Sequence, residues 1–432
     1  MIYLGIFLLL FLGLGLIRVP IPFAMGIAAV STMIYADLNI LSVPMSVANS
    51  LNIFTWLAIP AFIFAGDLMA ATGIATAIMS FSKSIIGRLR GAAGAVTVVT
   101  CMLFGAITGS SLATISGIGG MMLPELEKEG YDKKYGTALI SACGFLGILI
   151  PPSIPGIIYA MMSGQNLMKV WLCTITPGLL LGLLYIIINY FYYGKKEPKN
   201  KDPLVLKEYT LGIAKATWAS SIALMMPVII FYGIYGGVFT PTEAGAVAVA
   251  YGLLVGWVIL PLKKMGWPKK KFTLLVKDAA VTSATIAMLN VFAAVAGKMV
   301  TFTRIPEMLT NTMLEFTDSK IVFLLILNIL LIIVGMFMET NSSILLLGPI
   351  LIPVAISFNV DPIHFAAIML LNLEIGMITP PFAANLFVGC KVGKLNMDEV
   401  LPHMVPFYIA AFIVLMVTTY VPSFALFLPN LI

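Results

Sequence analysis

The sequence predicts an all-α polytopic membrane protein built as an inverted repeat, with a re-entrant hairpin and a broken helix in each half. The first observation is composition, because 60% of the 432 residues are hydrophobic and only 10% are charged, against about 25% in soluble domains. The second is that apolar runs of about twenty residues recur along the whole chain. The third is a Pro-Pro motif that occurs twice in similar surroundings, as "GILIPPS" at 147–153 and "GMITPPF" at 376–382.

The apolar runs place the membrane spans. We predict continuous spans at 2–17, 21–36, 53–72, 170–193, 217–236, 243–260, 279–300 and 404–428, and broken spans at 135–162 and 365–392. Two adjacent prolines remove backbone donors and clash with the preceding turn, so the broken spans are expected to be interrupted at Pro151 and Pro380. The first run lacks a basic region and a small-residue cleavage site, and we interpret it as a retained span rather than a signal peptide.

Two further apolar stretches, 92–124 and 320–357, are interrupted by the polar segments "TGSSLATISG" and "METNSS". We predict that each is a helix–turn–helix hairpin that enters the membrane and returns to the same face. Lys and Arg gather at 83–90, 128–134, 195–207 and 263–277, which predicts that these segments are cytoplasmic. The first two clusters flank 92–124, so both are cytoplasmic only if that stretch crosses an even number of times. The same count places the N-terminus in the periplasm.

The two halves of the chain resemble each other in sequence. "FIFAGDLMAATGI" at 62–74 aligns with "AAVAGKMVTFTRI" at 293–305, and the two Pro-Pro motifs align at nearly the same shift. An odd number of predicted crossings separates the halves, so the second is inverted. We therefore predict a first repeat at 1–193, a cytoplasmic linker at 194–216 and a second repeat at 217–432. Inverted repeats with paired broken helices are typical of secondary transporters.

The breaks and hairpin tips are the candidate site. A broken helix exposes backbone groups that lipid cannot satisfy but a bound ion or polar substrate can. Hydroxyl groups at a hairpin tip and carbonyl oxygens at a break would together suit a hard monovalent cation. In the first half these are Thr108, Ser110, Ser111 and Thr114 with Gly147, Ile150 and Pro152; in the second, Thr340, Asn341, Ser342 and Ser343 with Gly376, Thr379 and Phe382. The helix N-termini after each tip and break would attract an anion.

Simpler interpretations exist for each feature. A single Pro-Pro can be a kink, and small polar residues often serve only as close helix-packing contacts, but the duplication favours function. Asp67, Glu339 and Glu374 are intramembrane carboxylates, which are usually functional. Asp67 aligns with Lys298, so a structural charge near an interface is an alternative for it. Glu374 precedes the second break and could orient the cation site or carry a proton.

Four segments carry a family resemblance. They are "FGAITGSSLATISGIGGMMLPEL" at 104–126, "GFLGILIPPSIPGIIYA" at 144–160, "GGVFTPTEAGAVAVAYG" at 236–252 and "NLEIGMITPPFAANLFV" at 372–388. These segments resemble the large membrane subunit of tripartite ATP-independent periplasmic (TRAP) transporters. Their order and spacing fit that family over essentially the whole chain. The resemblance implies an elevator-type, sodium-driven transporter of the bacterial inner membrane. Its substrate would be a carboxylate: a C4-dicarboxylate, a sialic acid, or another sugar or organic acid.

The resemblance also implies partners and ligands. A soluble periplasmic binding protein would deliver the solute, and a small four-helix membrane subunit would accompany the chain. Because the chain starts at its first large-subunit span, we expect that subunit to be separate. No organic cofactor is expected. About two sodium sites are expected. On this resemblance the sodium sites would use Thr108, Ser110, Gly147, Ile150 and Pro152, and Gly335, Thr340, Gly376, Thr379 and Phe382. The candidates for substrate contact, which do not depend on the resemblance, are Ser111, Ser153, Asn341, Ser342 and Asn385.

Two other functions are alternatives to this one. A stand-alone divalent-anion–sodium symporter shares the inverted-repeat architecture and needs no binding protein, but its hairpin tips usually read Ser-Asn-Thr, unlike "TGSS" and "TNSS". An intramembrane enzyme is disfavoured because neither His364 nor His403 lies in a pairing motif and "TISG" lacks the first Gly of a G-x-S-G motif. No phosphate-binding loop is present, and the basic residues lie in short loops, so neither ATP nor nucleic acid is expected. The four cysteines have no C-x-x-C spacing.

Overall fold

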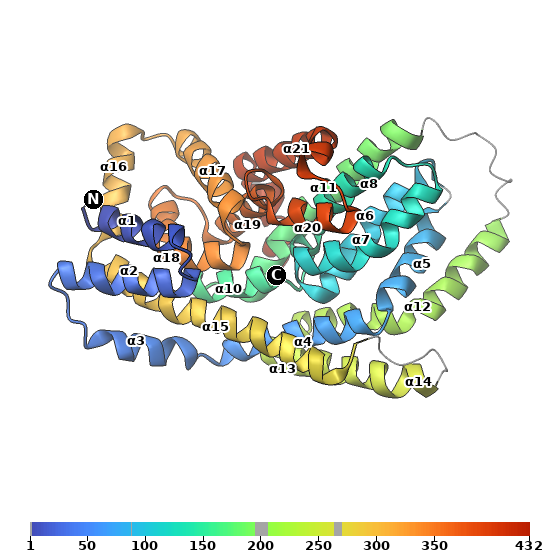
Figure 1. Ribbon diagram of the computed structural model, residues 1–432, viewed down its shortest axis with the longest axis horizontal. Helices are drawn as coiled ribbons and strands as arrows, with labels where there is room; N and C mark the ends of the chain where they lie inside the picture. The colour runs from blue at the N-terminus through green and yellow to red at the C-terminus, as the bar shows by residue number, and fades with distance from the viewer. Residues whose placement is uncertain (1, 88, 195–205, 263–269) are drawn as a thin grey trace.

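The structure is a computed structural model that describes residues 2–87, 89–194, 206–262 and 270–432 (Figure 1). Over these residues the chain forms helices and no strand. The longer helices are α1 (Ile2–Leu16), α2 (Ile21–Tyr35), α3 (Ser42–Leu51), α4 (Ala58–Ala71), α5 (Ile74–Ile86), α6 (Ala92–Thr108), α7 (Ser111–Lys128), α8 (Lys133–Gly144), α10 (Ile154–Ser163), α11 (Leu167–Asn189), α12 (Leu206–Tyr235), α13 (Pro241–Leu253), α15 (Phe272–Phe302), α16 (Ile305–Phe316), α17 (Lys320–Phe337), α18 (Thr340–Ser357), α19 (Pro362–Ile378), α20 (Ala384–Gly393) and α21 (Met397–Tyr420). The shorter ones are α9 (Leu146–Leu149), α14 (Leu260–Leu262) and α22 (Pro422–Leu426), with tighter or wider turns at Phe54–Leu57, Tyr190–Gly194, Leu254–Ile259 and Pro429–Leu431.

The predicted spans correspond to helices. Within the described ranges, seven helices are long and apolar enough to cross a membrane, and the bent pair of 133–149 with α10 makes an eighth. The chain is therefore a multi-pass membrane protein. The predicted span 404–428 differs in its bounds, because α21 starts at Met397 and ends at Tyr420, just before Pro422 begins a short new helix. In the predicted linker 194–216, Gly194 ends the turn at Tyr190–Gly194, residues 195–205 lie outside the described part, and 206–216 are the start of α12.

Three helices were not among the predicted spans: α3, α5 and α16. A left-handed backbone at Gly73 (φ 74°) ends α4 and starts α5, and Arg304 (φ 52°) does the same between α15 and α16. Glycine takes this conformation at no steric cost, whereas arginine does so only where its surroundings hold it there. Each of the three has 13 residues or fewer, so apolar length alone did not separate them from their neighbours.

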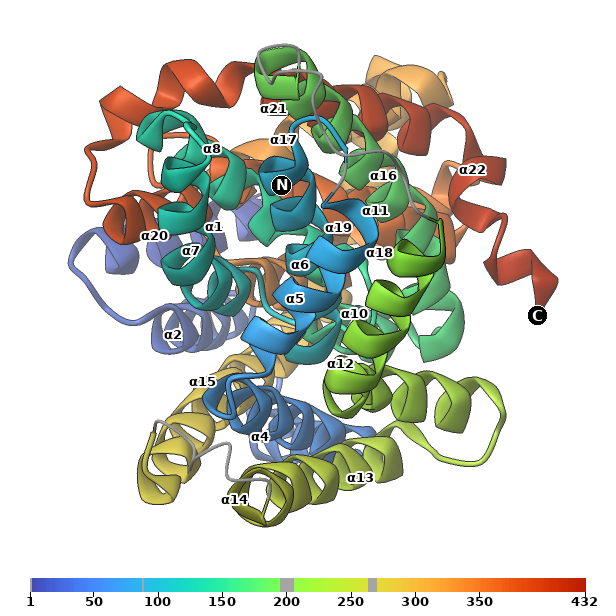
Figure 2. The same cartoon turned by 90° about the vertical axis from the view of Figure 1, so that its right-hand side faces the viewer.

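The helices form two packed layers (Figures 1 and 2). The first layer lies along the lower side of both views; in it α4 packs on α13 and α15, and α15 also packs on α2 and α3. The second layer contains α6–α11 and α17–α21. The helices at the predicted spans 170–193 and 404–428, α11 and α21, pack on α19 and on each other. They belong to the second layer.

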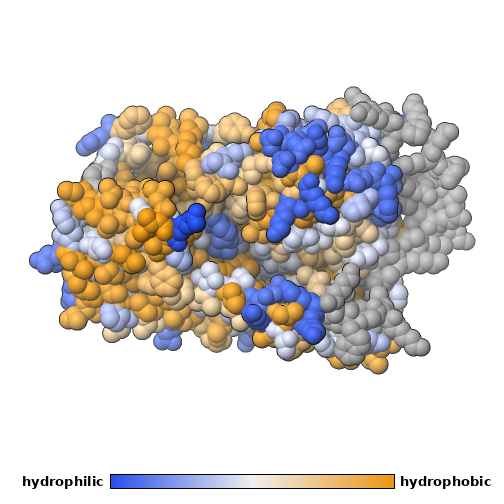
Figure 3. Space-filling view, viewed as in Figure 1, coloured by the Kyte–Doolittle hydropathy of each residue, from blue (hydrophilic) through white to orange (hydrophobic). Residues whose placement is uncertain are grey.

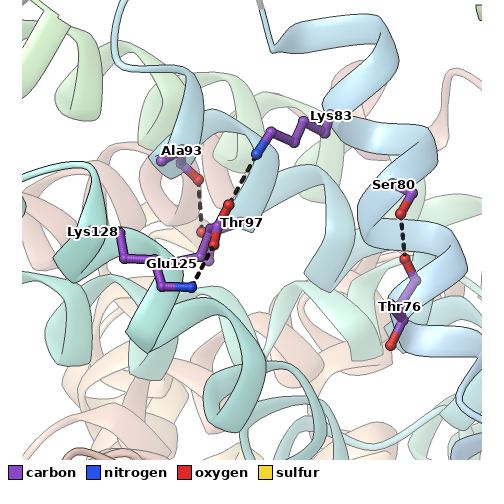
Figure 4. A network of polar contacts seen from close by, with 7 residues as sticks. All are labelled: Thr76, Ser80, Lys83, Ala93, Thr97, Glu125 and Lys128. Atoms are coloured by element: carbon purple, nitrogen blue, oxygen red, sulfur yellow. Dashed lines mark hydrogen bonds and ion pairs between the residues drawn. The ribbon is translucent and has the colours of Figure 1, made fainter.

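One end of the molecule is polar and brings together the flanks of the first hairpin. Figure 3 shows hydrophilic residues gathered over α7, α8 and α20, whereas apolar residues cover the opposite end of the same face. Lys83 of α5 and Lys128 of α7 both pair with Glu125, with N–O distances of 2.9 and 3.7 Å (Figure 4). At the same end, the Asn189 amide donates to the carbonyl of Gly91, 2.6 Å away. The chain before α6 and the chain after α7 therefore lie side by side.

Candidate functional site

The first hairpin tip lies between α6 and α7. Gly109 ends α6 in the left-handed conformation (φ 60°), and Ser110 is the N-cap of α7, its hydroxyl accepting from the backbone N–H of Ala113 at 3.4 Å. The hydroxyl of Thr114 donates to the carbonyl of Ser110 at 2.8 Å and lies 3.4 Å from the hydroxyl of Thr108. Several oxygen atoms are therefore held within a few residues of one turn.

The first helix break lies against this tip. Residues 150–153 separate α9 from α10. A Cβ added at Gly105 would lie only 1.9 Å from the Cα of Gly147, so the two backbones touch where α6 crosses α9. A Cβ added at Gly109 would lie 3.1 Å from the carbonyl oxygen of Pro152. The structure thus brings the predicted tip residues and the predicted break residues of the first sodium site together.

The second hairpin tip lies between α17 and α18 and carries a charge. Glu339 is the N-cap of α18; its carboxylate accepts from the backbone N–H of Ser342 at 3.4 Å and from the Asn341 side-chain amide at 2.5 Å. The hydroxyl of Ser343 donates to the carbonyl of Glu339 at 3.1 Å. An acid side chain at a helix N-terminus suits the helix dipole, so this group is part of the tip itself.

The second break repeats the close backbone contact of the first. A Cβ added at Gly376 would lie 2.5 Å from the carbonyl carbon of Gly335, so α19 and α17 meet without side chains between them. Thr379 follows the last turn of α19; its N–H donates to the carbonyl of Gly376 at 2.9 Å and its hydroxyl to that of Ile375 at 2.7 Å. A hydroxyl oxygen that donates in this way still has lone pairs for a cation.

Glu374 joins the second tip to the second break. Its side chain is fully buried, and its carboxylate accepts from the hydroxyl of Thr340 at 2.6 Å and from the side-chain amide of Asn385 at 3.2 Å. The hydroxyl of Ser111, from the first tip, is a further hydrogen-bonding neighbour. This carboxylate therefore contacts polar groups from both hairpins and from α20, the helix after the break.

Two predicted site residues have surroundings that limit their role. Phe382 is 64% exposed, and its ring packs on Phe337 with the centroids 5.5 Å apart, so only its backbone could serve as an ion ligand. Ser153 is buried as the N-cap of α10, and its carbonyl accepts from the indole N–H of Trp171 at 3.1 Å. Its hydroxyl has no hydrogen-bond partner among the residues that the structure describes.

A cavity of about 550 Å³ lies between the two tips and the first layer. Its lining comes from α4, the first tip, α9, α10, α15 and the second tip. Of the predicted substrate residues, Ser111, Asn341 and Ser342 line it, whereas Ser153 and Asn385 do not. Thr108 and Ser110, predicted for sodium, also reach the lining. The two hairpins therefore open onto one shared space.

Sequence reasoning missed the contribution of α15 to this cavity. Thr282 and Thr285 line it, and residues three apart in a helix share a face. Two hydroxyls at that spacing inside an apolar span were the signal that could have found them. Asp67 of α4 lines the cavity as well, which favours the functional interpretation of this carboxylate over a structural charge near an interface.

The atoms at the two tips that could bind a metal ion are oxygen atoms. Among the described residues no group of three or more His, Cys, Asp or Glu side chains could hold a metal ion, and the four cysteines are buried and unbridged. What the tips and breaks offer is hydroxyl and carbonyl oxygen, with a few carboxylates nearby. Such ligands suit hard cations and not the softer transition metals.

The chain was compared with known proteins. The family described as "Tripartite ATP-independent periplasmic transporter, DctM component" matches residues 8–424. The isethionate TRAP transporter permease protein DctMQ of Oleidesulfovibrio alaskensis is 37% identical over 97% of this chain, and the chain spans 64% of that relative's length. The C4-dicarboxylate TRAP transporter large permease protein DctM of Vibrio cholerae is 34% identical, with 98% of this chain and 97% of the relative covered. The sialic acid TRAP transporter large permease protein SiaM of the same species is 32% identical, with 97% of each covered.

A solved structure shares the fold. The YdaH transporter of Alcanivorax borkumensis superimposes with a TM-score of 0.59, covering 88% of this chain and 86% of the other at 13% identity. At that identity the likeness shows the fold alone. The family match covers nearly the whole chain, and its relatives are transporter permeases. The chain therefore belongs to the DctM component family of tripartite ATP-independent periplasmic transporters.

Proposed function

We propose that the chain carries out sodium-coupled uptake of a carboxylate solute across the bacterial inner membrane. The observation that carries this proposal is the convergence of two tip-and-break units on one cavity. In the first unit the tip lies against the carbonyl oxygen of Pro152, and in the second the tip hydroxyl of Thr340 donates to Glu374 just before the break. Backbone oxygens at broken helices coordinate sodium in secondary transporters, and helix N-termini there bind anions. A cation held by both parts would fix the tip to the break and complete the cavity wall.

The sodium ligands follow from the two units. At the first, the hydroxyls of Thr108 and Ser110 and the carbonyls of Gly147, Ile150 and Pro152 would hold one ion. At the second, the ligands would be backbone oxygens of Gly335, Gly376 and Phe382 and the hydroxyls of Thr340 and Thr379. The hydroxyl of Thr340 donates to Glu374 at 2.6 Å. This orients its lone pairs away from that carboxylate, toward a cation.

The motion would be of the elevator type. The second layer, with both hairpins, both broken helices, α11 and α21, would slide past the first layer with the loaded cavity. Both hairpins would be re-entrant and approach from opposite faces, as expected of an inverted repeat with a periplasmic N-terminus. The supporting observation is that the flanks of the first hairpin lie side by side, joined by the Lys83–Glu125–Lys128 contacts.

The partners are proposed from the family and its relatives. The family is described as tripartite and periplasmic, which supports a periplasmic binding protein and a small membrane subunit as the other two parts. Named relatives act on isethionate, C4-dicarboxylates and sialic acid. The substrate of this chain is accordingly a small organic acid.

The test is uptake by proteoliposomes that contain the chain and its small partner, with the cognate binding protein added outside. We expect uptake only with an inward sodium gradient and with the binding protein present. Equal uptake with potassium in place of sodium on both sides would contradict the proposed sodium coupling. Full-rate uptake without the binding protein would assign the chain to the stand-alone symporter mechanism instead.

Topology has its own test. After replacement of the four native cysteines, which are all buried, single cysteines at Ala93 and Glu129 should both react with a membrane-impermeant thiol reagent from the cytoplasmic side. Cysteines at 108–114 and 338–344 should be protected by sodium. Labelling of positions 93 and 129 from opposite faces would make α6–α7 a true crossing and refute the first re-entrant hairpin.

A further inference from the structure

We propose that a groove between the start of α6 and the end of α11 binds one anionic phospholipid, with the headgroup phosphate at Arg90 and an acyl chain along α11. Because the site concerns only the lipid around a multi-pass membrane protein, it stands independently of the proposed sodium coupling and substrate. Three features carry it: the lining of the groove, an arginine without an ion pair, and an apolar stripe that continues from the groove along α11.

The groove has a volume of about 450 Å³ and lies away from the cavity between the two tips. Four of its described lining residues are apolar: Leu89, Ala95, Ile186 and Ile187. The other two are Arg90 and Tyr190. Apolar walls with a single cation suit a molecule that has a long apolar part and one negatively charged group. An anionic phospholipid has both parts.

Arg90 is the charged group of the groove and is only partly exposed. The described lysines between positions 83 and 134 all have acid partners: Lys83 and Lys128 pair with Glu125, Lys133 with Glu127, and Lys134 with Glu399. Arg90 has no ion pair with any acid that the structure describes. A guanidinium is always charged and its planar fork matches the oxygens of a phosphate. A lipid phosphate would give Arg90 the partner that its neighbours already have.

The backbone at Arg90 is held in place before any lipid binds. The Asn189 amide donates to the carbonyl of Gly91, 2.6 Å away, and a Cβ added at Gly194 would lie 3.1 Å from the carbonyl oxygen of Arg90. Both contacts fix this segment against the end of α11. In addition, the 17-residue helix α6 begins just after Arg90 without a side-chain cap, so the positive end of its dipole also favours a phosphate there.

An apolar stripe leads away from the groove along α11. Leu179, Leu183 and Ile187 are all exposed and follow one another at intervals of four, so they share one face of the helix. The helix and its last turn form a membrane span of 28 residues, which means that an exposed face of this kind meets acyl chains. Ile187 belongs both to the stripe and to the groove. An acyl chain that starts at the groove can therefore continue along the stripe.

The lipid should carry a net negative charge. In the predicted topology this end of the molecule faces the cytoplasm, and the cytoplasmic leaflet contains anionic lipids. A zwitterionic headgroup brings its own ammonium close to its phosphate, and that ammonium repels Arg90. Phosphatidylglycerol has no such cation, and its hydroxyl groups can pair with the hydroxyl of Tyr190. It is the probe for the test.

The test measures lipid binding to the purified, delipidated chain by native mass spectrometry and by the shift in thermal unfolding. The additives are phosphatidylglycerol, phosphatidylethanolamine with the same two chains, and glycerophosphate, which carries the phosphate without chains. We expect one molecule of phosphatidylglycerol to bind about fivefold more tightly than phosphatidylethanolamine, which is the contribution of one arginine near an anionic membrane surface. Glycerophosphate should produce no shift.

Three variants test the role of Arg90. Arg90→Gln should abolish the fivefold preference, and Arg90→Lys, which keeps the charge, should retain most of it. Lys128→Gln is the matched control, because it removes one positive charge from the same end of the molecule but lies outside the groove. Its preference for phosphatidylglycerol should stay within about twofold of the unaltered chain.

Equal binding of phosphatidylglycerol to Arg90→Gln and to the unaltered chain would overturn the assignment of the headgroup to Arg90. An equal loss in Lys128→Gln would also overturn it, because the attraction would then be general to this end of the molecule. Stabilisation by glycerophosphate as strong as that by phosphatidylglycerol would replace the lipid with a soluble phosphate ester. If Arg90→Gln does not fold, the three additives on the unaltered chain still decide: equal affinity for the two lipids refutes the anionic site.

Discussion

The two tip-and-break units, 92–163 and 320–393, share their backbone geometry and differ in their charge. In both, a glycine of the first hairpin helix touches a glycine of the broken helix, and a hydroxyl one turn into the second hairpin helix donates to the N-cap carbonyl. At the N-cap, however, the first unit has Ser110 and the second Glu339. Two residues before the contact glycine of the break, the first has Phe145 and the second the buried Glu374.

This difference separates what fixes the shape of a unit from what fixes its chemistry. Glycine and proline set the close crossing and the break, and neither depends on a charged side chain, so the same shape recurs with different neighbours. The second unit has two acid side chains near its oxygen ligands, whereas the first has none of its own. Under the proposed function, the second sodium site therefore has acid groups beside it and the first relies on hydroxyl and carbonyl oxygens, and the following substitutions test that contrast.

The largest effect should come from filling the glycine contacts. In Gly147→Ala the new Cβ would lie 2.6 Å from the Cα of Gly105, and in Gly376→Ala it would lie 2.5 Å from the carbonyl carbon of Gly335. Backbone cannot move aside as a flexible side chain can, so each change should lower the free energy of unfolding by about 3 kcal/mol. Thermal unfolding in detergent measures this, with Gly120→Ala, which would have open space, as the control. If only one of the pair is tolerated, the units differ in backbone as well as in charge.

Glu374→Gln should act on sodium binding at the second unit. It replaces one oxygen of a buried acid side chain that accepts from Thr340 and Asn385, and leaving a buried polar group without its partner costs about 1–3 kcal/mol. The sodium concentration for half-maximal uptake should rise about a hundredfold. Phe145→Leu, at the corresponding place in the first unit, should leave it unchanged. Equal shifts in both variants would mean that the carboxylate acts only through packing.

Removing single hydroxyl ligands should have a smaller effect. Thr379→Val keeps the shape and the β-branch but loses the oxygen. Ser110→Ala removes the hydroxyl oxygen at the first unit and, with it, the side-chain cap of α7. Each should raise the sodium requirement for uptake roughly tenfold, equivalent to about 1.4 kcal/mol. Ser80→Ala, whose hydroxyl only bonds Thr76 within α5 (Figure 4), is the control. An unchanged sodium response in the first two would show that the breaks are packing features.

The smallest effect should come from the exposed ion pair at the polar end. Lys83 hydrogen-bonds Glu125 and holds the pKa of that carboxyl below its ordinary value. A lowered pKa means that the stabilisation is complete above the ordinary pKa and is lost as the pH falls through the lowered one. Glu125→Gln should cost no more than about 1 kcal/mol, because surface pairs contribute little. Unfolding measured from about pH 6 to about pH 2 should show the difference between the two proteins shrinking as the pH falls below the ordinary pKa; a difference that grows instead would contradict this assignment.

The sequence predicted the breaks and tips well because proline, glycine and small polar residues act locally. Two adjacent prolines interrupt a helix whatever surrounds them, so the positions 150–153 and 379–383 were readable. The partners of each tip could not be predicted in the same way. Thr282 of α15 and Ser111 line one cavity because of how the two layers pack, and no local sequence pattern carries that information. The proximity of Glu374 to both hairpins likewise arises only from the tertiary arrangement. The helices that α11 and α21 pack against could not be predicted either, because both sequences are largely apolar on all sides.

The hydroxyl of Tyr159 donates to the carbonyl of Pro362, which lies 203 residues further along the chain, and α10 packs on α18. A ribosome that adds about 5–20 residues per second needs roughly 10–40 s to cover that distance. For this time the first break is in the membrane without the helices that enclose it, and its free backbone groups cannot be satisfied by lipid. The nascent first half must therefore be sheltered until the second half emerges, so the yield of folded protein should depend on the speed of translation between the two breaks.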